Sequence, residues 1–120
     1  MKAININDDY FPFTDCIIDG VKTVETREKR TLKSLVGTRV GIISTSKTRK
    51  ALLVGYVNII DEIKYNSEEE FRTDYKKHLV LPGSKFDIKP GCVKYGYVLA
   101  DPERCDPVPV NSKGIVIRNI

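Results

Sequence analysis

The sequence predicts a mostly β protein of the α+β class, in which about six or seven short strands form a small barrel with two helices packed outside it. Short segments rich in β-branched residues, several of them alternating apolar and polar side chains, indicate the strands. The helical segments do not follow the strands in a β-α-β-α order, which argues against a doubly wound parallel sheet. A length of 120 residues without a linker-like stretch favours a single domain over residues 1–120.

The first half of the chain contains one predicted helix between strands. Phe13, Cys16 and Ile17 recur at helical spacing and supply a buried stripe, and Pro12 falls in the first turn, where its missing N–H does no harm. Gly20 can adopt the left-handed conformation that ends a helix. The other elements expected in this half are strands at residues 3–6, 21–27 and 39–44, a helical turn at 31–36 and a polar loop at 44–50.

The second half begins with the longest apolar run, residues 51–60, which is the best candidate for a central strand. Gly55 within this run indicates a bulge or a sharp coil. Ser67 before three glutamates is an N-cap signature, and it predicts a helix to about residue 78 with Phe71 and Tyr75 on its buried face. The remaining expected elements are a loop at 81–91, a strand at 94–100, a turn at 101–106 and closing strands at 108–110 and 115–117.

The charge is moderately basic and unevenly distributed. The formal net charge is +4 and the pI is about 9.0, which tolerates a polyanionic partner without requiring one. Residues 27–50 contain eight basic side chains and one acid, whereas residues 61–76 contain six acids and three bases. We therefore expect a positive lobe and an acidic one, although a patchy solvated surface accounts for the same counts.

Cysteine, histidine and hydropathy patterns exclude several classes of protein. Three cysteines without a C-x-x-C pair, together with the single histidine, His78, argue against a disulfide scaffold and against a zinc site. His78 is best interpreted as a helix-terminal residue. The N-terminus lacks the apolar run of a signal peptide, and no stretch is long and apolar enough to span a bilayer. We expect a cytoplasmic protein with no membrane partner, no metal and no cofactor.

The most informative stretch is the octapeptide at residues 20–27, which contains Gly20, Lys22, Glu25 and Arg27. Lys22 falls in the turn after the predicted helix, where a long side chain can reach over a neighbouring cleft. In a strand, Glu25 and Arg27 lie on the same face. The three charges form either a surface ion pair on a hairpin or a preorganised set in which Glu25 fixes the Arg27 guanidinium toward a phosphate.

The octapeptide, lying between a short helix and a strand, resembles the signature of the ASCH domain, a family of PUA-like β-barrels. The similarity continues through Gly37–Thr45, Val54–Val57, Tyr97–Leu99 and the segment 107–114, and it covers roughly residues 3–117 in the expected order. The resemblance implies a small PUA-like barrel with a cleft between its first helix and the barrel, lined by the motif. It also implies an RNA or nucleotide ligand, because ASCH-like domains are associated with RNA.

The same resemblance offers an enzymatic alternative. Some small bacterial members are amidohydrolases that remove the acetyl group from N4-acetylcytidine, using a Lys and a Thr of the motif and a Glu from a later segment. The Lys position matches Lys22, whereas the Thr position holds Glu25. Asp61, Glu62 and Glu68 remain alternatives for the later acid. Catalysis by Lys22 with Glu25 is therefore the second hypothesis, and binding of RNA or a nucleotide is the first.

Two further sets of residues complete the candidate site. Hydroxyls and a cation in the predicted 44–50 loop can hold a phosphate or a base edge, and four arginines and lysines can form a nucleic-acid patch. As ligand-binding residues we expect Gly20, Lys22, Glu25, Arg27, Ser44, Thr45, Ser46 and Lys47, and as patch residues Arg30, Arg39, Arg49 and Lys50.

Overall fold

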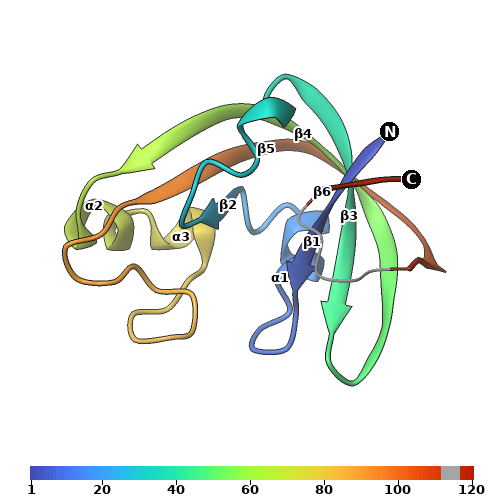
Figure 1. Cartoon of the computed structure of the whole chain (residues 1–120), viewed down its shortest axis with the longest axis horizontal. Coiled ribbons are helices and arrows are strands. Elements are labelled where there is room, and N and C mark those ends of the chain that lie inside the picture. Colours follow the sequence, from blue (N-terminus) through green and yellow to red (C-terminus); the bar gives the residue numbers. More distant parts are fainter. Residues whose placement is uncertain (112–116) are drawn as a thin grey trace.

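The computed structural model describes residues 1–111 and 117–120. Its strands form one curled sheet in the order β2-β5-β4-β3-β1-β6, and β4 and β5 arch over the helices (Figure 1). This arrangement confirms the predicted mostly β class with small helices. The elements are β1 (Lys2–Asn7), α1 (Phe13–Ile18), β2 (Val24–Arg27), the 3-10 helix η1 (Lys33–Leu35), β3 (Thr38–Ser46), β4 (Arg49–Tyr65), α2 (Glu68–Thr73), α3 (Tyr75–His78), β5 (Lys94–Pro109) and β6 (Ile117–Asn119).

The longest feature is an antiparallel ribbon of β4 and β5, which pair from Tyr65 with Lys94 to Leu52 with Pro109. One of its register shifts lies between Leu53 and Gly55, so the bulge predicted at Gly55 is confirmed. A Cβ atom on Gly55 would lie 2.3 Å from the carbonyl oxygen of Glu103. The glycine therefore lets the two strands approach closely at the bulge.

Two of the predicted loops are wrong because the strands continue through them. The polar segment 44–50 is a tight hairpin in which β3 runs to Ser46 and β4 begins at Arg49. The turn expected at 101–106 lies inside β5, which ends only at Pro109. The side chains of residues 101–104 are exposed, so this part of the strand lacks the apolar alternation by which a sequence indicates a strand.

The first helix, α1, ends as predicted. Gly20 has φ of +78°, and the N–H groups of Val21 and Lys22 both donate to the carbonyl of Cys16 at 2.9 Å. These bonds satisfy a carbonyl that the helix end leaves without an intrahelical donor. The turn they make delays the start of the next strand, so β2 begins at Val24 rather than at residue 21.

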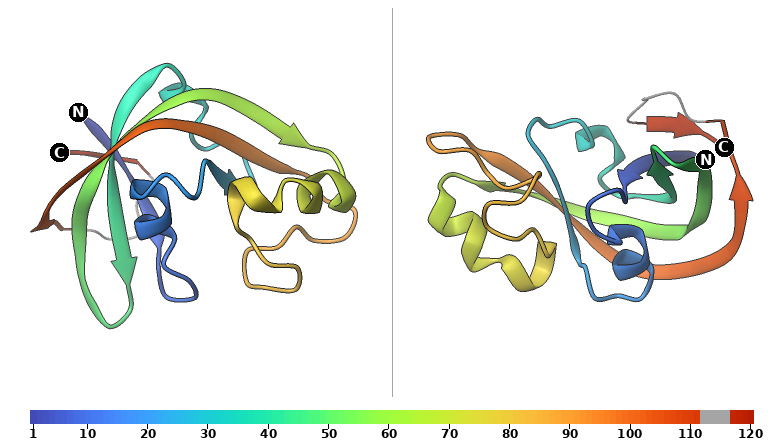
Figure 2. Two further views of the ribbon diagram at one scale, coloured as in Figure 1. Left: turned by 180° about the vertical axis from the view of Figure 1, so that it is seen from behind. Right: turned by 90° about the horizontal axis from the view of Figure 1, so that it is seen from below.

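The predicted second helix forms two short ones, α2 and α3, separated by a turn at Asp74. Ser67 caps α2 as expected, because its Oγ accepts a hydrogen bond from the Glu70 N–H at 3.1 Å. Phe71 is fully buried, but Tyr75 is exposed, so the expected buried face is only half correct. Figure 2 shows α1 and the α2–α3 pair on the concave side of the sheet, with the segment that contains β2 between them.

The main core lies between this concave face and the helices. Ile4, Ile42 and Ile59 contribute from the sheet, Ile17 from α1 and Phe71 from α2, and all five side chains are buried. Of the predicted closing strands, 108–110 is the end of β5 and the residue after it, whereas most of 115–117 lies outside the described residues; β6 pairs antiparallel with β1. No helix of the described residues is long and apolar enough to cross a membrane.

Candidate functional site

A cleft of about 740 Å³ opens between β1, β2, the β3–β4 hairpin and the segment 79–93 that follows α3. Its apolar lining comes largely from Ile6, Phe13, Val80 and Phe86. Its charged lining is mostly basic, because six cations face two acids in the described part of the wall. The cations are Lys22, Arg27, Lys29, Arg49, Lys50 and Lys94, and the acids are Glu25 and Glu28.

Lys22 is the most buried charge of the octapeptide, with 2% of its surface exposed. Its ammonium donates a hydrogen bond to the backbone carbonyl of His78 at the end of α3. The Nζ atom lies 3.7 Å from Oε1 of Glu25 and 4.7 Å from the centre of the Phe13 ring. A carbonyl, a carboxylate and a ring face thus replace the water that a lysine normally keeps.

Burial lowers the pKa of Lys22 from 10.5 to about 8. Loss of solvation is the largest cause, Glu25 acts in the opposite direction by stabilising the cation, and Arg27 lowers the value further. The sequence left open whether Glu25 or Arg27 dominates. Burial outweighs both of them, so Lys22 loses its proton at a mildly alkaline pH.

Glu25 and Arg27 form an ion pair on one face of β2, through a single oxygen of the carboxylate. The Nε atom of Arg27 donates to Oε2 of Glu25 at 3.1 Å, and Nη2 lies 3.0 Å from the same oxygen. Nη2 also donates to the backbone carbonyl of Asn5 on β1 at 2.9 Å. The guanidinium is therefore fixed from two strands and borders the cleft in a single orientation.

Lys94 is a cleft residue that sequence reasoning missed. It is 4% exposed, and its Nζ donates to the carbonyl of Phe86 at 2.6 Å and lies 5.7 Å from the centre of the Phe71 ring. Burial lowers its pKa as well. A lysine at the start of an amphipathic strand is normally solvated. Only the pairing of Arg27 with the adjacent Tyr95 would have placed Lys94 beside the octapeptide.

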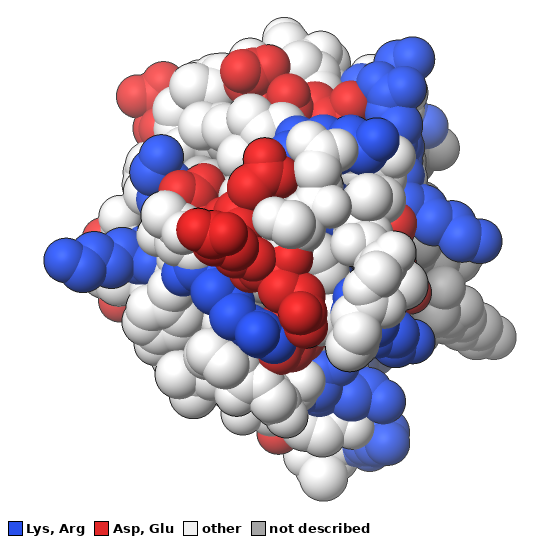
Figure 3. Space-filling view, turned by 90° about the vertical axis from the view of Figure 1, so that its left-hand side faces the viewer, with Lys and Arg blue, Asp and Glu red and all other residues white. Residues whose placement is uncertain are grey.

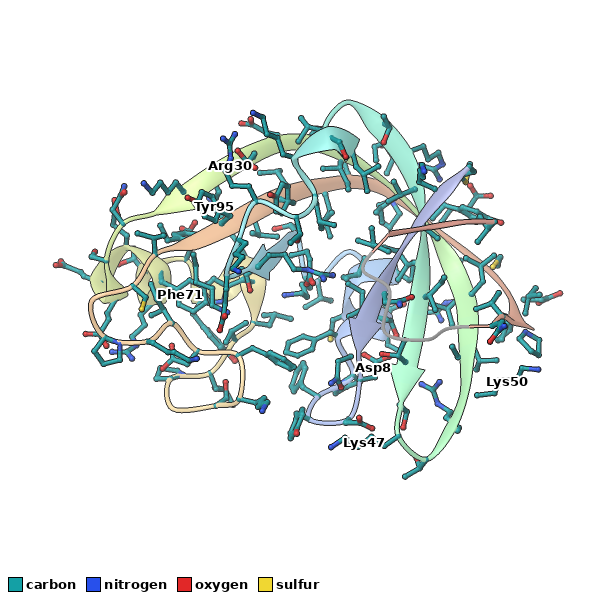
Figure 4. All side chains as sticks on the ribbon, in the orientation of Figure 1. Asp8, Arg30, Lys47, Lys50, Phe71 and Tyr95 are labelled. Atoms are coloured by element: carbon teal, nitrogen blue, oxygen red, sulfur yellow. The ribbon has the colours of Figure 1, made fainter. Side chains whose placement is uncertain are left out.

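The hydroxyl residues of the β3–β4 hairpin divide between the cleft and the interior. Thr45 and Ser46 line the cleft. Ser44 is buried, and its hydroxyl donates to Oδ2 of Asp8. Lys47 lies exposed at the hairpin tip, below Asp8 in the view of Figure 4. Of the four ligand-binding residues predicted at positions 44–47, Thr45 and Ser46 are thus the two that border the cleft.

The four expected patch cations do not form one surface. Arg49 and Lys50 line the cleft. Arg30 pairs with Glu62 at 2.6 Å, and Arg39 pairs with Glu103 at 2.9 Å. In Figure 4, Arg30 lies beside Tyr95 at the opposite end of the molecule from Lys47 and Lys50. Gly20, which was predicted as a ligand-binding residue, contributes through its backbone conformation, because its positive φ turns the chain so that Lys22 points inward.

The three acids considered as later members of the site lie elsewhere. Glu62 accepts hydrogen bonds from Arg30 and, at 2.7 Å, from Tyr97. Asp61 accepts from the Glu62 N–H, and Glu68 pairs with Arg72. The side of the molecule that carries α2 shows a band of acidic side chains (Figure 3). In the described part of the cleft wall, Glu25 and Glu28 are the acids.

The fold just described is shared with solved structures of ASCH proteins. A variant of an ASCH protein from Zymomonas mobilis superimposes with a TM-score of 0.79 at 15% identity, over 99% of this chain and 87% of that one. Another structure of ASCH from the same organism gives 0.71 at 17% identity, over 91% and 73% of the two chains. No family model and no curated protein sequence matches the chain.

Proposed function

We propose that this ASCH-like domain binds RNA or a nucleotide in the cleft lined by Lys22, Glu25 and Arg27. The observation that carries the proposal is the combination of six cations with apolar and aromatic walls in one concave site. A volume of about 740 Å³ lies in the range of small-ligand sites. Nucleic-acid ligands need this combination, since bases pack on apolar faces and phosphates need cations.

The apolar and the charged residues of the cleft suit different parts of a nucleotide. Phe13 and Phe86 supply ring faces for a base, and their centroids lie 6.1 Å apart. Arg49 and Lys50 lie on the hairpin side, where exposed cations suit the phosphates of a flexible chain. Thr45 and Ser46 add hydroxyl groups to the lining.

Glu25 supports ligand binding by orienting Arg27. Because the carboxylate and the Asn5 carbonyl engage Nε and Nη2, the remaining edge of the guanidinium is held in place before a ligand arrives. A group that is already fixed loses less conformational entropy on binding. This arrangement favours the preorganised interpretation of the octapeptide over a mobile surface ion pair.

The test is the salt dependence of RNA binding. Fluorescence anisotropy with a labelled single-stranded RNA should show affinity that falls steeply with salt, and the Arg49→Glu, Lys50→Glu double variant should bind weakly. Each lost phosphate contact lowers the logarithmic salt slope by about 0.7 for a single strand. The matched control is Lys76→Glu, a charge reversal on α3 outside the cleft wall. Salt-insensitive binding, or an equal loss in the control, contradicts the proposal.

A specific observation also favours a second function, hydrolysis of an amide on a modified nucleoside. Lys22 has its pKa lowered to about 8 and borders the cleft, so a neutral amine is accessible near physiological pH. It would take a proton from water as the water attacks the amide carbonyl, and the ammonium so formed would return this proton to the departing nitrogen as the C–N bond breaks. Glu25 lies 3.7 Å from Nζ and holds the resulting ammonium.

This second function is tested by turnover of acylated cytidines. The expected result is release of the carboxylic acid by the wild-type protein and none by Lys22→Ala with an unchanged circular dichroism spectrum. The rate should rise with pH through about 8 as Lys22 loses its proton. An absence of turnover across a panel of acylated nucleosides removes the hydrolase hypothesis and leaves the binding proposal intact.

A further inference from the structure

Two lysines are buried in the wall of the same cleft. Each donates to a backbone carbonyl of the segment that begins with α3: Lys22 to His78 and Lys94 to Phe86. Each also lies over a phenylalanine ring. Burial of a charge costs several kcal/mol unless a partner compensates it. Two buried lysines beside one cavity therefore need groups that compensate their charge.

The buried charges around these lysines do not balance. Lys22, Lys94 and Arg27 face one buried carboxylate, Glu25, which interacts electrostatically with both lysines. Asp87 also acts on Lys94, but it is already paired with Arg72 at 2.9 Å. Glu28 is the acid that acts most strongly on Lys94, but its side chain is 64% exposed and lies 3.8 Å from the Lys89 ammonium, so water and Lys89 already compensate its charge. Three cations against one carboxylate leave the deep cleft with two positive charges in excess.

The same region also retains hydrogen-bond donor capacity. An ammonium group carries three N–H donors, and Lys94 uses one of them on the Phe86 carbonyl among the described residues. Arg27 uses Nε and Nη2 on Glu25 and Asn5. The remaining donors belong to groups that line the cleft. Both the charge and the donors match a compact anion with several acceptor oxygens.

We propose that Lys94, together with Lys22 and Arg27, forms a seat for a terminal phosphate group. The inference rests on the proposed function and narrows its ligand to a nucleoside monophosphate or to an RNA end that carries a phosphate monoester. A monoester carries a charge of about −1.5 to −2 at neutral pH and three acceptor oxygens, whereas an internal phosphodiester carries one charge. Only the monoester matches the excess of two charges.

The position of the other cations agrees with this division. Lys29, Arg49 and Lys50 line the cleft but are exposed, so they suit the internal phosphates of a strand that leaves the cleft. The buried lysines, Lys22 and Lys94, suit the phosphate at the end of that strand. Lys94 is thus a specificity-determining residue, and the rim cations contribute general affinity.

The experiment compares one RNA sequence in three forms: with a 5′-phosphate, with a 3′-phosphate and with hydroxyls at both ends. We expect one phosphorylated form to bind about tenfold more tightly or better, since an additional charge-assisted contact supplies at least this factor. Lys94→Met, which removes the charge and keeps an apolar chain, should abolish the difference in affinity between the phosphorylated and the unphosphorylated forms. Titrations with mononucleotides and with the matching nucleosides distinguish a free nucleotide from an RNA end.

The controls separate this inference from the proposed function. Lys29→Met, at the rim, should weaken all three RNAs equally, and Lys94→Arg should retain part of the preference for the phosphorylated end. Thermal unfolding of each variant shows that the fold persists. Equal binding of the three RNAs, or a preference that persists in Lys94→Met, overturns the terminal-phosphate seat and leaves RNA binding standing. Failure of all three RNAs and of the mononucleotides to bind overturns both.

Discussion

The ammonium of Lys22 donates a hydrogen bond to the backbone carbonyl of His78, which lies 56 residues later in the chain. The N–H of the next residue after Lys22, Thr23, donates to the carbonyl of Lys77 at 2.9 Å. The octapeptide is therefore joined to α3 through two consecutive residues. A substitution that displaces α3 should therefore also displace the Lys22 ammonium, and a substitution at Lys22 should affect the position of α3.

Replacement of Lys22 by methionine should stabilise the protein at neutral pH and lose this advantage in alkali. Between pH about 8 and 10.5 the unfolded chain holds a proton on Lys22 that the folded chain has released, so wild-type stability rises with pH in this window. A shift from 10.5 to about 8 corresponds to about 3 kcal/mol. The measurement is urea unfolding of both proteins from pH 7 to pH 10.

The comparison between the two proteins is essential, because tyrosines also titrate in alkali. Tyr97 has its pKa raised to about 12 by burial and by Glu62, and it affects both proteins alike. A stability difference between wild type and Lys22→Met that stays constant from pH 7 to pH 10 contradicts the lowered pKa of Lys22.

His78 should make the protein sensitive to acid. Its Nδ1 accepts from the Val80 N–H at 2.9 Å, so its Nε2 carries the proton and donates to the Phe71 carbonyl at 2.6 Å. Burial lowers its pKa from 6.5. Below pH about 6.5 the unfolded chain binds a proton that the folded chain refuses, and stability falls as the pH is lowered.

A His78→Phe variant tests this acid sensitivity. It should lose about 1–3 kcal/mol at pH 7, because the Val80 N–H loses its acceptor and the Phe71 carbonyl its donor. It should also lose less stability than the wild type between pH 6.5 and pH 5. Denaturant titrations at these two pH values provide the comparison, and parallel losses in the two proteins would count against a neutral buried histidine.

Glu25→Gln should destabilise the protein by about 3 kcal/mol, because it leaves Arg27 and Lys22 without their buried carboxylate. It should also lower the pKa of Lys22 further, since Glu25 now raises it. The matched control is Glu103→Gln, which breaks the exposed pair with Arg39 and should cost about 0–1 kcal/mol. Equal losses in the two variants would show that Glu25 is no more than a surface partner.

Gly55→Ala should destabilise the ribbon of β4 and β5. The new Cβ would meet the Glu103 carbonyl oxygen at 2.3 Å and Cδ1 of Ile18 at 2.6 Å, and overpacking of this kind costs about 1–3 kcal/mol. The control is Gly83→Asn, at a position with φ of +79° and open space around it, where asparagine is tolerated. Thermal unfolding compares the two, and a neutral Gly55→Ala would refute the close approach.

Local patterns in the sequence predicted the fold well and the site in part. Periodicity at Phe13 and Ile17 and the cap at Gly20 sufficed for α1, because these signals act within a few residues. The pairing of Glu25 with Arg27 follows from the period of a strand in the same way. The exposed half of β5 was missed because its residues 101–109 contain three prolines and little apolar alternation.

The remaining errors concern contacts between distant residues. Lys94 is buried only because the segment 79–93 folds over it and presents the Phe86 carbonyl. Arg30 and Arg39 fall in the same basic run as Arg49, but pairing of the strands separates them. Register and chain path decide both outcomes, and neither can be read from composition or spacing.

The acceptors of both buried ammonium groups are main-chain carbonyls, and this has a consequence for protein engineering. Every amino acid carries such a carbonyl, so the residues at 78 and 86 can be exchanged without deleting the acceptor itself. A library that randomises the solvent-facing positions between residues 78 and 86 would leave the hydrogen bonds of Lys22 and Lys94 in place as long as the path of the chain is unchanged. The stretch between residues 78 and 86 is therefore the region in which new ligand preferences can be selected while Lys22 and Lys94 keep their hydrogen-bond acceptors.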